Sequence, residues 1–268
     1  MTKSYRLAQV ALVLAVLLPV WFMVAALGTK IGLWGWQTGL GTMSAQIGPI
    51  MMGAVGLLAL IALIWCLVKP PRKGWLLALV ALLIPAIMMV TAGGMRDRAG
   101  ENPIHDVSTD AVDPPTFSQA LVDMRAENEL NPIRDYSAVL RDSGPWGDNA
   151  FPDVADETHT SLVPQLYPDL EPLVVDASAE DALVAAQAAM MESGYDNVFS
   201  TPDEGRVEGV SETFWYGFKD DVVARIRTAE NGTVIDFRSV SRVGLSDLGA
   251  NADRIRELRA AVAEKLGA

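Results

Sequence analysis

The sequence predicts an α-helical membrane anchor of three transmembrane helices, followed by a soluble α+β domain in which an antiparallel sheet has two helices packed on one face. No Asp or Glu precedes Met95 in the 268 residues, and this part holds three long apolar runs. The rest of the chain holds 15 of the 21 Lys and Arg and all 33 Asp and Glu, a net charge of −18. Several of its segments alternate apolar and polar residues, as strands do. The two parts are therefore built for different solvents.

The three apolar runs cover residues 7–28, 47–68 and 75–92. Each is close to the roughly 20 residues that a helix needs to cross a bilayer. The first has the basic flank of a secretory signal, but its length favours a retained helix. No acidic or basic side chain lies inside a run, so the helices are expected to anchor the chain and to carry no transport chemistry.

Basic residues near the helix ends predict the orientation. Lys3 and Arg6 precede the first helix, and Lys69, Arg72 and Lys73 crowd the loop between the second and third. Basic loops stay in the cytoplasm. We therefore expect a multi-pass protein of the inner (plasma) membrane, with a cytoplasmic N-terminus and a periplasmic C-terminal domain.

The domain organisation follows from composition. Residues 1–95 form the anchor, 96–172 an extended Pro/Asp-rich segment packed on the soluble domain, and 173–268 the α+β domain. The extended segment shows one short helical pattern, at 118–129. The cluster at 145–148 indicates a turn with its tryptophan docked on the domain.

Regular elements are expected from residue 173 onward. Strands are predicted at 173–176, 196–201, 206–215, 222–227 and 233–243, and helices at 178–194 and from Ser246 to the C-terminal end. The pair Asn231 and Gly232 between the last two strands predicts a type I′ hairpin turn.

The last strand carries an unusual charge pattern. Alternation places Asp236, Arg238 and Arg242 on one face, where Arg225 and Arg227 of the preceding strand can join them. These side chains suit a cross-strand ion-pair network on an exposed face, which is the first interpretation. They also suit an anion-binding surface, because arginines outnumber acids here in a strongly acidic domain.

Candidate site residues follow from these patterns. Those expected to bind a ligand are Arg238, Arg242, Asp236, Asp247 and Asn251. Weaker catalytic candidates are His105, Asp106, Asp220 and Asp221, since a histidine beside a carboxylate can serve as a general acid or base. One cysteine and two histidines assemble no structural zinc site by their spacing, although His105 beside Asp106, with Asp110 and Asp113 nearby, could supply a metal ligand. The sequence leaves the cofactor unknown. Its acidity argues against nucleic acid as a partner.

Three blocks carry a resemblance to a known family. They are NPIHDVSTDAVDPPTF at 102–117, QLYPDLEPL at 165–173, and the closing stretch with GFKDDVVARIR and VIDFRSVSRVGLSDLGANADRIR. Together they resemble the bacterial and plastid-related family known as domain of unknown function 1499, many members of which carry membrane helices before the domain. The resemblance implies no activity, cofactor or substrate. Its pattern contains His105, Asp106, Asp110, Pro114, Pro115, Phe117, Asp220, Asp221, Arg238, Ser239, Arg242, Gly244, Asp247, Gly249, Asn251 and Arg254.

Three functions remain open at this stage. The leading hypothesis is a membrane-anchored periplasmic binding or scaffolding module, in which the face with Arg238 and Arg242 meets a protein or an anionic small ligand. The alternative is a periplasmic hydrolase-like enzyme that uses His105 and Asp106. The third is an accessory subunit of a membrane complex, with the helices as the interface. Since the sequence shows no nucleophile elbow, phosphate loop or dinucleotide fingerprint, catalysis is the less favoured reading.

Overall fold

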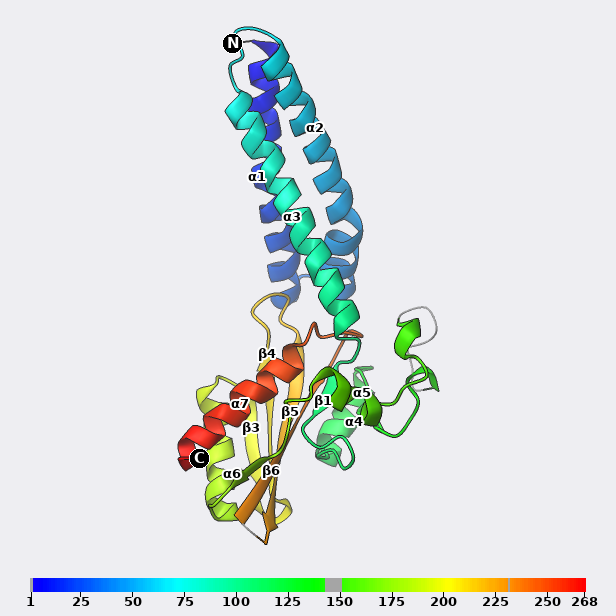
Figure 1. The fold of residues 1–268 in the computed structure, drawn as a ribbon, viewed down its shortest axis with the longest axis vertical. Coiled ribbons are helices and arrows are strands. Elements are labelled where there is room, and N and C mark those ends of the chain that lie inside the picture. The colour runs from blue at the N-terminus through cyan, green and yellow to red at the C-terminus, as the bar shows by residue number, and fades with distance from the viewer. Residues whose placement is uncertain (1, 143–150, 231) are drawn as a thin grey trace. The chain divides into compact units, whose positions relative to one another are not determined.

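The computed structural model describes residues 2–142, 151–230 and 232–268 (Figure 1). Two compact units make up the chain. One is Met1–Arg96 with Thr213–Gly217, and the other is Asp97–Glu212 with Phe218–Ala268. The turn expected at 145–148 and the hairpin residue Asn231 lie outside the described residues.

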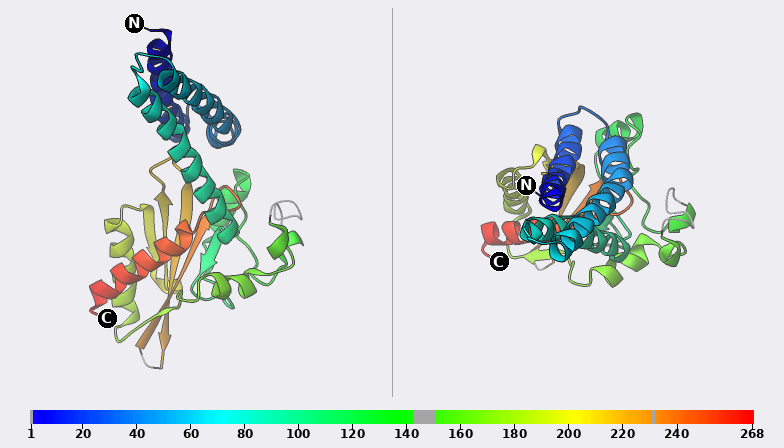
Figure 2. Two further views of the ribbon diagram at one scale, coloured as in Figure 1. Left: turned by 45° about the horizontal axis from the view of Figure 1, so that its top comes forward. Right: turned by 90° about the horizontal axis from the view of Figure 1, so that it is seen from above.

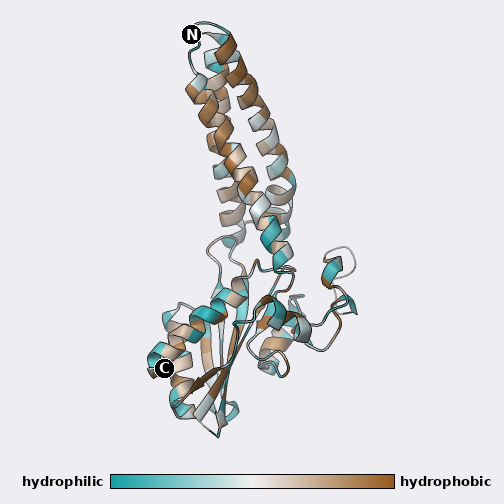
Figure 3. Ribbon diagram, viewed as in Figure 1, coloured by the Kyte–Doolittle hydropathy of each residue, from teal (hydrophilic) through white to brown (hydrophobic). Residues whose placement is uncertain are grey.

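The first unit contains three helices that are long and apolar enough to cross a membrane, as predicted. They are α1 (Lys3–Lys30), the π-helical segment η1 (Gln37–Ile47) with α2 (Gly48–Val68), and α3 (Trp75–Glu101). Brown, hydrophobic residues cover most of their length in Figure 3. Each helix extends beyond its apolar run, because hydrogen bonding continues into the polar flanks after the hydropathy signal stops.

Small side chains form the contacts between these helices. Ala11 and Ala15 of α1, Ala59 and Ala62 of α2, and Ala81 of α3 are all fully buried. Lipid tails are as apolar as leucine, so close backbone approach at such residues is the main source of helix association in a bilayer. Close packing at these alanines therefore favours association of the three helices.

The second unit contains the remaining helices and strands. They are β1 (Asp106–Ser108), α4 (Gln119–Glu127), η2 (Leu140–Asp142), η3 (Pro152–Val154), α5 (His159–Leu166), β2 (Leu173–Val175), α6 (Ala179–Glu192), β3 (Asp196–Thr201), η4 (Pro202–Glu204), β4 (Arg206–Glu212), β5 (Lys219–Ala229), β6 (Gly232–Ser241) and α7 (Ala250–Leu266). The predicted order of strand, helix, four strands and helix is confirmed.

The sheet is antiparallel throughout, in the order β1-β6-β5-β4-β3. Strand β2 also pairs with β6, at its first residues, while β1 pairs with its second half. The long β6 is thus flanked on one side by β5 and on the other by two short strands from the segment before α6.

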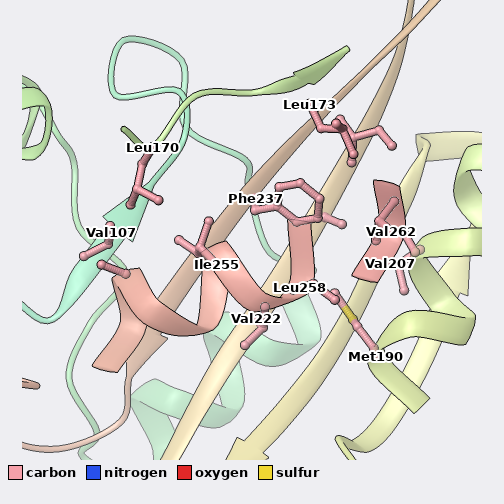
Figure 4. Packing of buried hydrophobic residues seen from close by; sticks show 14 of the residues in the cluster. Val107, Leu170, Leu173, Met190, Val207, Val222, Phe237, Ile255, Leu258 and Val262 are labelled. Carbon is pink, nitrogen blue, oxygen red and sulfur yellow. The ribbon is translucent and has the colours of Figure 1, made fainter. Parts of the chain in front are cut away.

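Helices α6 and α7 cover one face of the sheet, and the rotated views of Figure 2 agree on this arrangement. Figure 4 shows Ile255 and Leu258 of α7 and Met190 of α6 meeting Val222 and Phe237 of the sheet. All five are 1% exposed or less. Each buried side chain of this size contributes on the order of 1.5–3 kcal/mol, so this layer is the main hydrophobic core.

The opposite face of the sheet is covered rather than open. Phe117 and the apolar side of α4 pack on Val223 and Val240, which are both fully buried. The sequence favoured an exposed face here, because charged residues alternate along β5 and β6. The structure differs because the segment between β1 and α4 brings its own acidic and aromatic residues onto that face.

Several boundaries differ from the sequence-based expectations. Strand β4 ends at Glu212 and not at 215, and α7 begins at Ala250 rather than after Ser246, with Gly249 as its N-cap at φ +86°. The sequence also missed β1 and α5. Both are short, and α5 contains a proline, so neither has a full hydrophobic period to reveal it.

Candidate functional site

Asp106 of β1 and Arg238 of β6 form a bidentate ion pair inside the second unit. Nε and Nη2 of Arg238 each donate to a different carboxylate oxygen of Asp106 at 2.8 Å, and the two residues are 2% and 0% exposed. The Tyr136 hydroxyl also donates to Asp106, and Arg238 donates to the carbonyls of Pro115 and Arg134. Burial raises the pKa of Asp106, but Arg238 outweighs it and holds that pKa at about 2. The pair is therefore charged at neutral pH and fully hydrogen-bonded.

Aromatic rings enclose this ion pair. The guanidinium carbon of Arg238 lies 4.7 Å from the centroid of the Tyr136 ring and 5.9 Å from that of Phe117. His159 stacks on Tyr136 with a centroid distance of 4.9 Å. Burial lowers the pKa of His105 and of His159 to about 4, so both imidazoles are neutral at pH 7.

A second ion-pair cluster surrounds Asp221 on the same face. Arg125 of α4, which is 1% exposed, donates to this carboxylate and to the carbonyls of Asn131 and Ser241. Arg242 donates to the other oxygen of Asp221 at 2.7 Å. These bonds hold α4 against the ends of β5 and β6.

A third cluster lies on the opposite face, beneath α7. Nη2 of Arg254 donates to Asp220 at 2.6 Å, and its Nη1 donates to the hydroxyl of Ser239 at 3.0 Å. The Ser239 hydroxyl donates to the amide oxygen of Asn251, whose amide nitrogen donates to the carbonyl of His105. Polar groups of α7 are thus bonded to β5, β6 and the start of β1.

Asp247 organises the beginning of α7. Its carboxylate accepts hydrogen bonds from the backbone N–H of Gly249 at 2.9 Å and of Asn251 at 2.7 Å. Burial raises the pKa of Asp247 to about 6, although both backbone bonds oppose the shift. Asp247 therefore binds backbone N–H groups at the start of α7, where the N-cap Gly249 has no side chain to do so.

The fourth cluster extends toward solvent at the other end of β6. Arg225 and Arg227 both donate to Oδ2 of Asp236, at 3.0 and 2.9 Å. Arg225 also donates to Asp113 at 2.8 Å, and both arginines lie 3.5 Å from Asp110. Arg227 is the most accessible arginine here, with 44% of its side chain exposed. The acids outnumber the arginines, so this end is net negative.

A pocket of about 400 Å³ opens beside Asp110. That volume is within the range typical of small-molecule sites. Its walls come from the loop after β1, from α5 and from the chain before β2. The lining residues are Ser108, Thr109, Asp110, Ala111, Val112, Thr160, Val163, Pro164, Leu170 and Pro172.

The four catalytic candidates do not share one accessible site. Asp220 and Asp221 are consecutive in β5, so their side chains lie on opposite faces of the sheet. His105 and Asp106 are both 0% exposed, and each of the three carboxylates is engaged by an arginine. Across residues 2–142, 151–230 and 232–268, no group of His, Cys, Asp and Glu is placed to hold a metal ion.

The five residues expected to bind a ligand are distributed over all four clusters. Arg238, Asp236 and Asn251 are at most 2% exposed, whereas Arg242 and Asp247 are partly exposed. Each makes hydrogen bonds within the domain. The sequence analysis predicted only some of their hydrogen-bond partners.

The sequence analysis did not identify four residues of these clusters, which are Arg125, Arg134, Tyr136 and His159. They lie in irregular chain or short helices, and their partners are as many as 116 residues away. One signal was available for Arg125. It is the single base of a helix that was itself predicted, so it was a candidate partner for a distant acid.

Comparisons with known proteins give a family and no activity. A family model described as "Protein of unknown function (DUF1499)" matches residues 106–262. No curated protein and no solved structure matches the chain. The matched stretch begins at Asp106 and ends at Val262, so it includes all four ion-pair clusters. Because the model spans more than half of the sequence, this chain belongs to the DUF1499 family of proteins of unknown function.

Proposed function

We propose that this protein is a membrane-anchored binding or scaffolding module, whose C-terminal domain faces the periplasm from the inner membrane and recognises a protein partner. One observation carries the proposal. The acids, arginines and histidines that could perform chemistry are buried in mutual contacts, so they stabilise the fold. Recognition by the outer surface is then the activity best supported.

The nature of the partner follows from how charge is distributed. Arginines of the network point inward: the side chains of Arg125 and Arg238 are 1% and 3% exposed. Other acids stay exposed, with Asp113, Asp156 and Glu192 at 70%, 80% and 71% exposure. The buried arginines are matched by buried acids, so the surface keeps the net negative charge of the C-terminal part; the buried arginines are Arg125, Arg134, Arg238 and Arg254, and the buried acids are Asp106, Glu208, Asp220, Asp221 and Asp236. A partner with a basic surface is favoured by this charge distribution.

Two other functions are less well supported. A small anion could approach Arg227 beside the pocket, but Asp110, Asp113 and Asp236 outnumber the two arginines there. A hydrolase needs an acid or base within reach of its substrate, and the candidates for that role are inaccessible.

Co-purification tests the proposal. The tagged full-length chain is extracted from native membranes with a mild detergent, at about 50 mM and about 500 mM salt, across which screening of surface charge becomes strong. We expect a stoichiometric protein partner that is retained at low salt and lost at high salt. The double variant Asp113→Asn/Glu192→Gln should weaken its retention, whereas Arg141→Gln, which neutralises an exposed base, should not. A chain that purifies alone at low salt, or a partner indifferent to salt, would refute the proposal.

The orientation has its own test. Ala268→Cys in a Cys66→Ala background places one thiol at the C-terminal end of the chain. A membrane-impermeant maleimide should label it in intact spheroplasts. Labelling only after lysis would place the domain in the cytoplasm and overturn the orientation while leaving the binding role open.

A further inference from the structure

The turn between β4 and β5 carries three consecutive aromatic residues. Phe214 and Trp215 are exposed, at 68% and 49%, and their rings meet edge to face with centroids 5.0 Å apart. Tyr216 and Gly217 both have positive φ angles, of 64° and 66°, and the Thr213 hydroxyl donates to the carbonyl of Trp215. The turn is therefore tight and presents two large rings together.

This segment belongs to the same compact unit as the transmembrane helices. The ammonium group of Lys30, at the end of α1, lies 3.3 Å from the carbonyl oxygen of Phe214 and 5.3 Å from the centroid of its ring. The Tyr216 hydroxyl is 2.7 Å from the hydroxyl of Ser44 in η1. Within this unit, Tyr216 contacts η1 and the Phe214 ring contacts Lys30, while Phe214 and Trp215 remain largely exposed.

The position of Lys30 gives the depth of the turn. Residue 30 is the last of the first membrane-spanning helix, so its ammonium group is expected at the boundary between hydrocarbon and water. Trp34, only four residues further on, has the amphipathic ring that is enriched at this level of the bilayer. Phe214 lies beside the same helix end, next to Lys30, and both Phe214 and the adjacent Trp215 keep a large part of their rings exposed.

We propose that Thr213–Gly217 is an interfacial membrane anchor, in which Phe214 and Trp215 enter the headgroup region of the bilayer. Tryptophan and phenylalanine supply apolar area for the acyl boundary, and the indole N–H can remain hydrated. Because the chain is already held in the membrane, insertion costs little translational entropy. The occupant of this exposed aromatic surface is lipid, and a protein partner at the same place is an outcome of the test.

The test uses the full-length chain in lipid vesicles. Single cysteines replace Phe214 or Trp215 in a Cys66→Ala background and carry an environment-sensitive fluorophore. Val184→Cys is the matched control, because Val184 is 59% exposed but lies on α6. Vesicles contain lipid with a nitroxide quencher near the headgroup or deep in the acyl chain.

We expect blue-shifted emission at both turn positions, with several-fold stronger quenching by the shallow nitroxide than by the deep one. The label at position 184 should show water-like emission and no lipid-dependent quenching. Water-like emission at 214 and 215 would overturn the proposal. Blue-shifted emission without quenching by either lipid would also overturn it, because protein rather than lipid would then cover the rings.

Discussion

The sharpest prediction concerns the ion pair of Asp106 and Arg238. Arg238→Met keeps the length of the side chain but removes four hydrogen bonds, two to Asp106 and one each to the carbonyls of Pro115 and Arg134. The Asp106 carboxylate is 0% exposed and would lose the guanidinium that binds both of its oxygens, keeping weaker bonds from the Tyr136 hydroxyl and the Arg134 backbone. Breaking a buried pair by removing one partner costs about 3–5 kcal/mol. That is a large fraction of the roughly 5–15 kcal/mol that stabilises a typical domain.

Hydrogen exchange in the full-length, detergent-solubilised chain measures this cost. A loss of about 3–5 kcal/mol should speed exchange of the protected β6 amides by roughly 150- to 5,000-fold, since about 1.4 kcal/mol is a factor of ten. Arg256→Met is the matched control. It breaks an ion pair with Asp169 whose side chains are 39% and 55% exposed, and such pairs contribute about 0–1 kcal/mol.

A double variant separates charge pairing from packing. Asp106→Leu combined with Arg238→Met removes both charges, so β6 should exchange more slowly than in either single variant. If Arg238→Met accelerated β6 exchange no more than Arg256→Met does, the pair would not stabilise the fold. The ligand-binding role expected from the sequence would then regain support.

Two further predictions follow from the same network. His105 and His159 have pKa values lowered to about 4, so they contribute stability that is complete above their ordinary pKa of 6.5 and is lost as the pH falls from 6.5 to 4. The loss approaches about 3 kcal/mol for each histidine, partly offset by Asp247, whose raised pKa favours the fold as the pH drops below about 6. Melting temperatures at pH 7.5 and 4.5 measure the net loss of stability. The double variant His105→Gln/His159→Gln should show a smaller difference between the two melting temperatures. An unchanged difference would mean that other groups cause the loss. Separately, Arg125→Met should loosen α4 by about 3 kcal/mol and Arg242→Met by about 1 kcal/mol, because Arg125 is 1% exposed and also holds two carbonyls. Hydrogen exchange of the α4 amides should be faster in Arg125→Met than in Arg242→Met, and the reverse result would contradict this prediction.

Local patterns were sufficient for the elements that are long and periodic. The apolar runs, helix α6 and strand β3 were all predicted from residues within their own boundaries. Strand β1 was not, because it has three residues and is stabilised by pairing with β6 at a distance of 130 residues or more. Such an element has no signal of its own in the sequence.

The sheet face that carries Arg238 and Arg242 shows why the site was harder to predict than the fold. Alternation along β6 correctly assigned Arg238 and Arg242 to one face, but it cannot show what covers that face. Of the covering residues, Asp106 lies in chain with little periodicity, and Arg125 lies in a predicted helix whose position over the sheet no local pattern gives. Arginines seemed to outnumber acids near β6 only because these distant acids were not counted. The apparent excess of positive charge was therefore half of an ion-pair network.

This network changes what the shared residues of the family pattern imply. Asp106, Asp221, Arg238 and Arg254 each belong to a buried cluster, and together these clusters join β1, α4 and α7 to the central strands. Substituting them should impair any function through stability, so a loss of function alone cannot identify a binding surface. Informative substitutions lie outside the four clusters, at exposed acids such as Glu192 and at the exposed rings of Phe214 and Trp215. A partner of this protein is accordingly best sought with variants that leave β6 exchange unchanged.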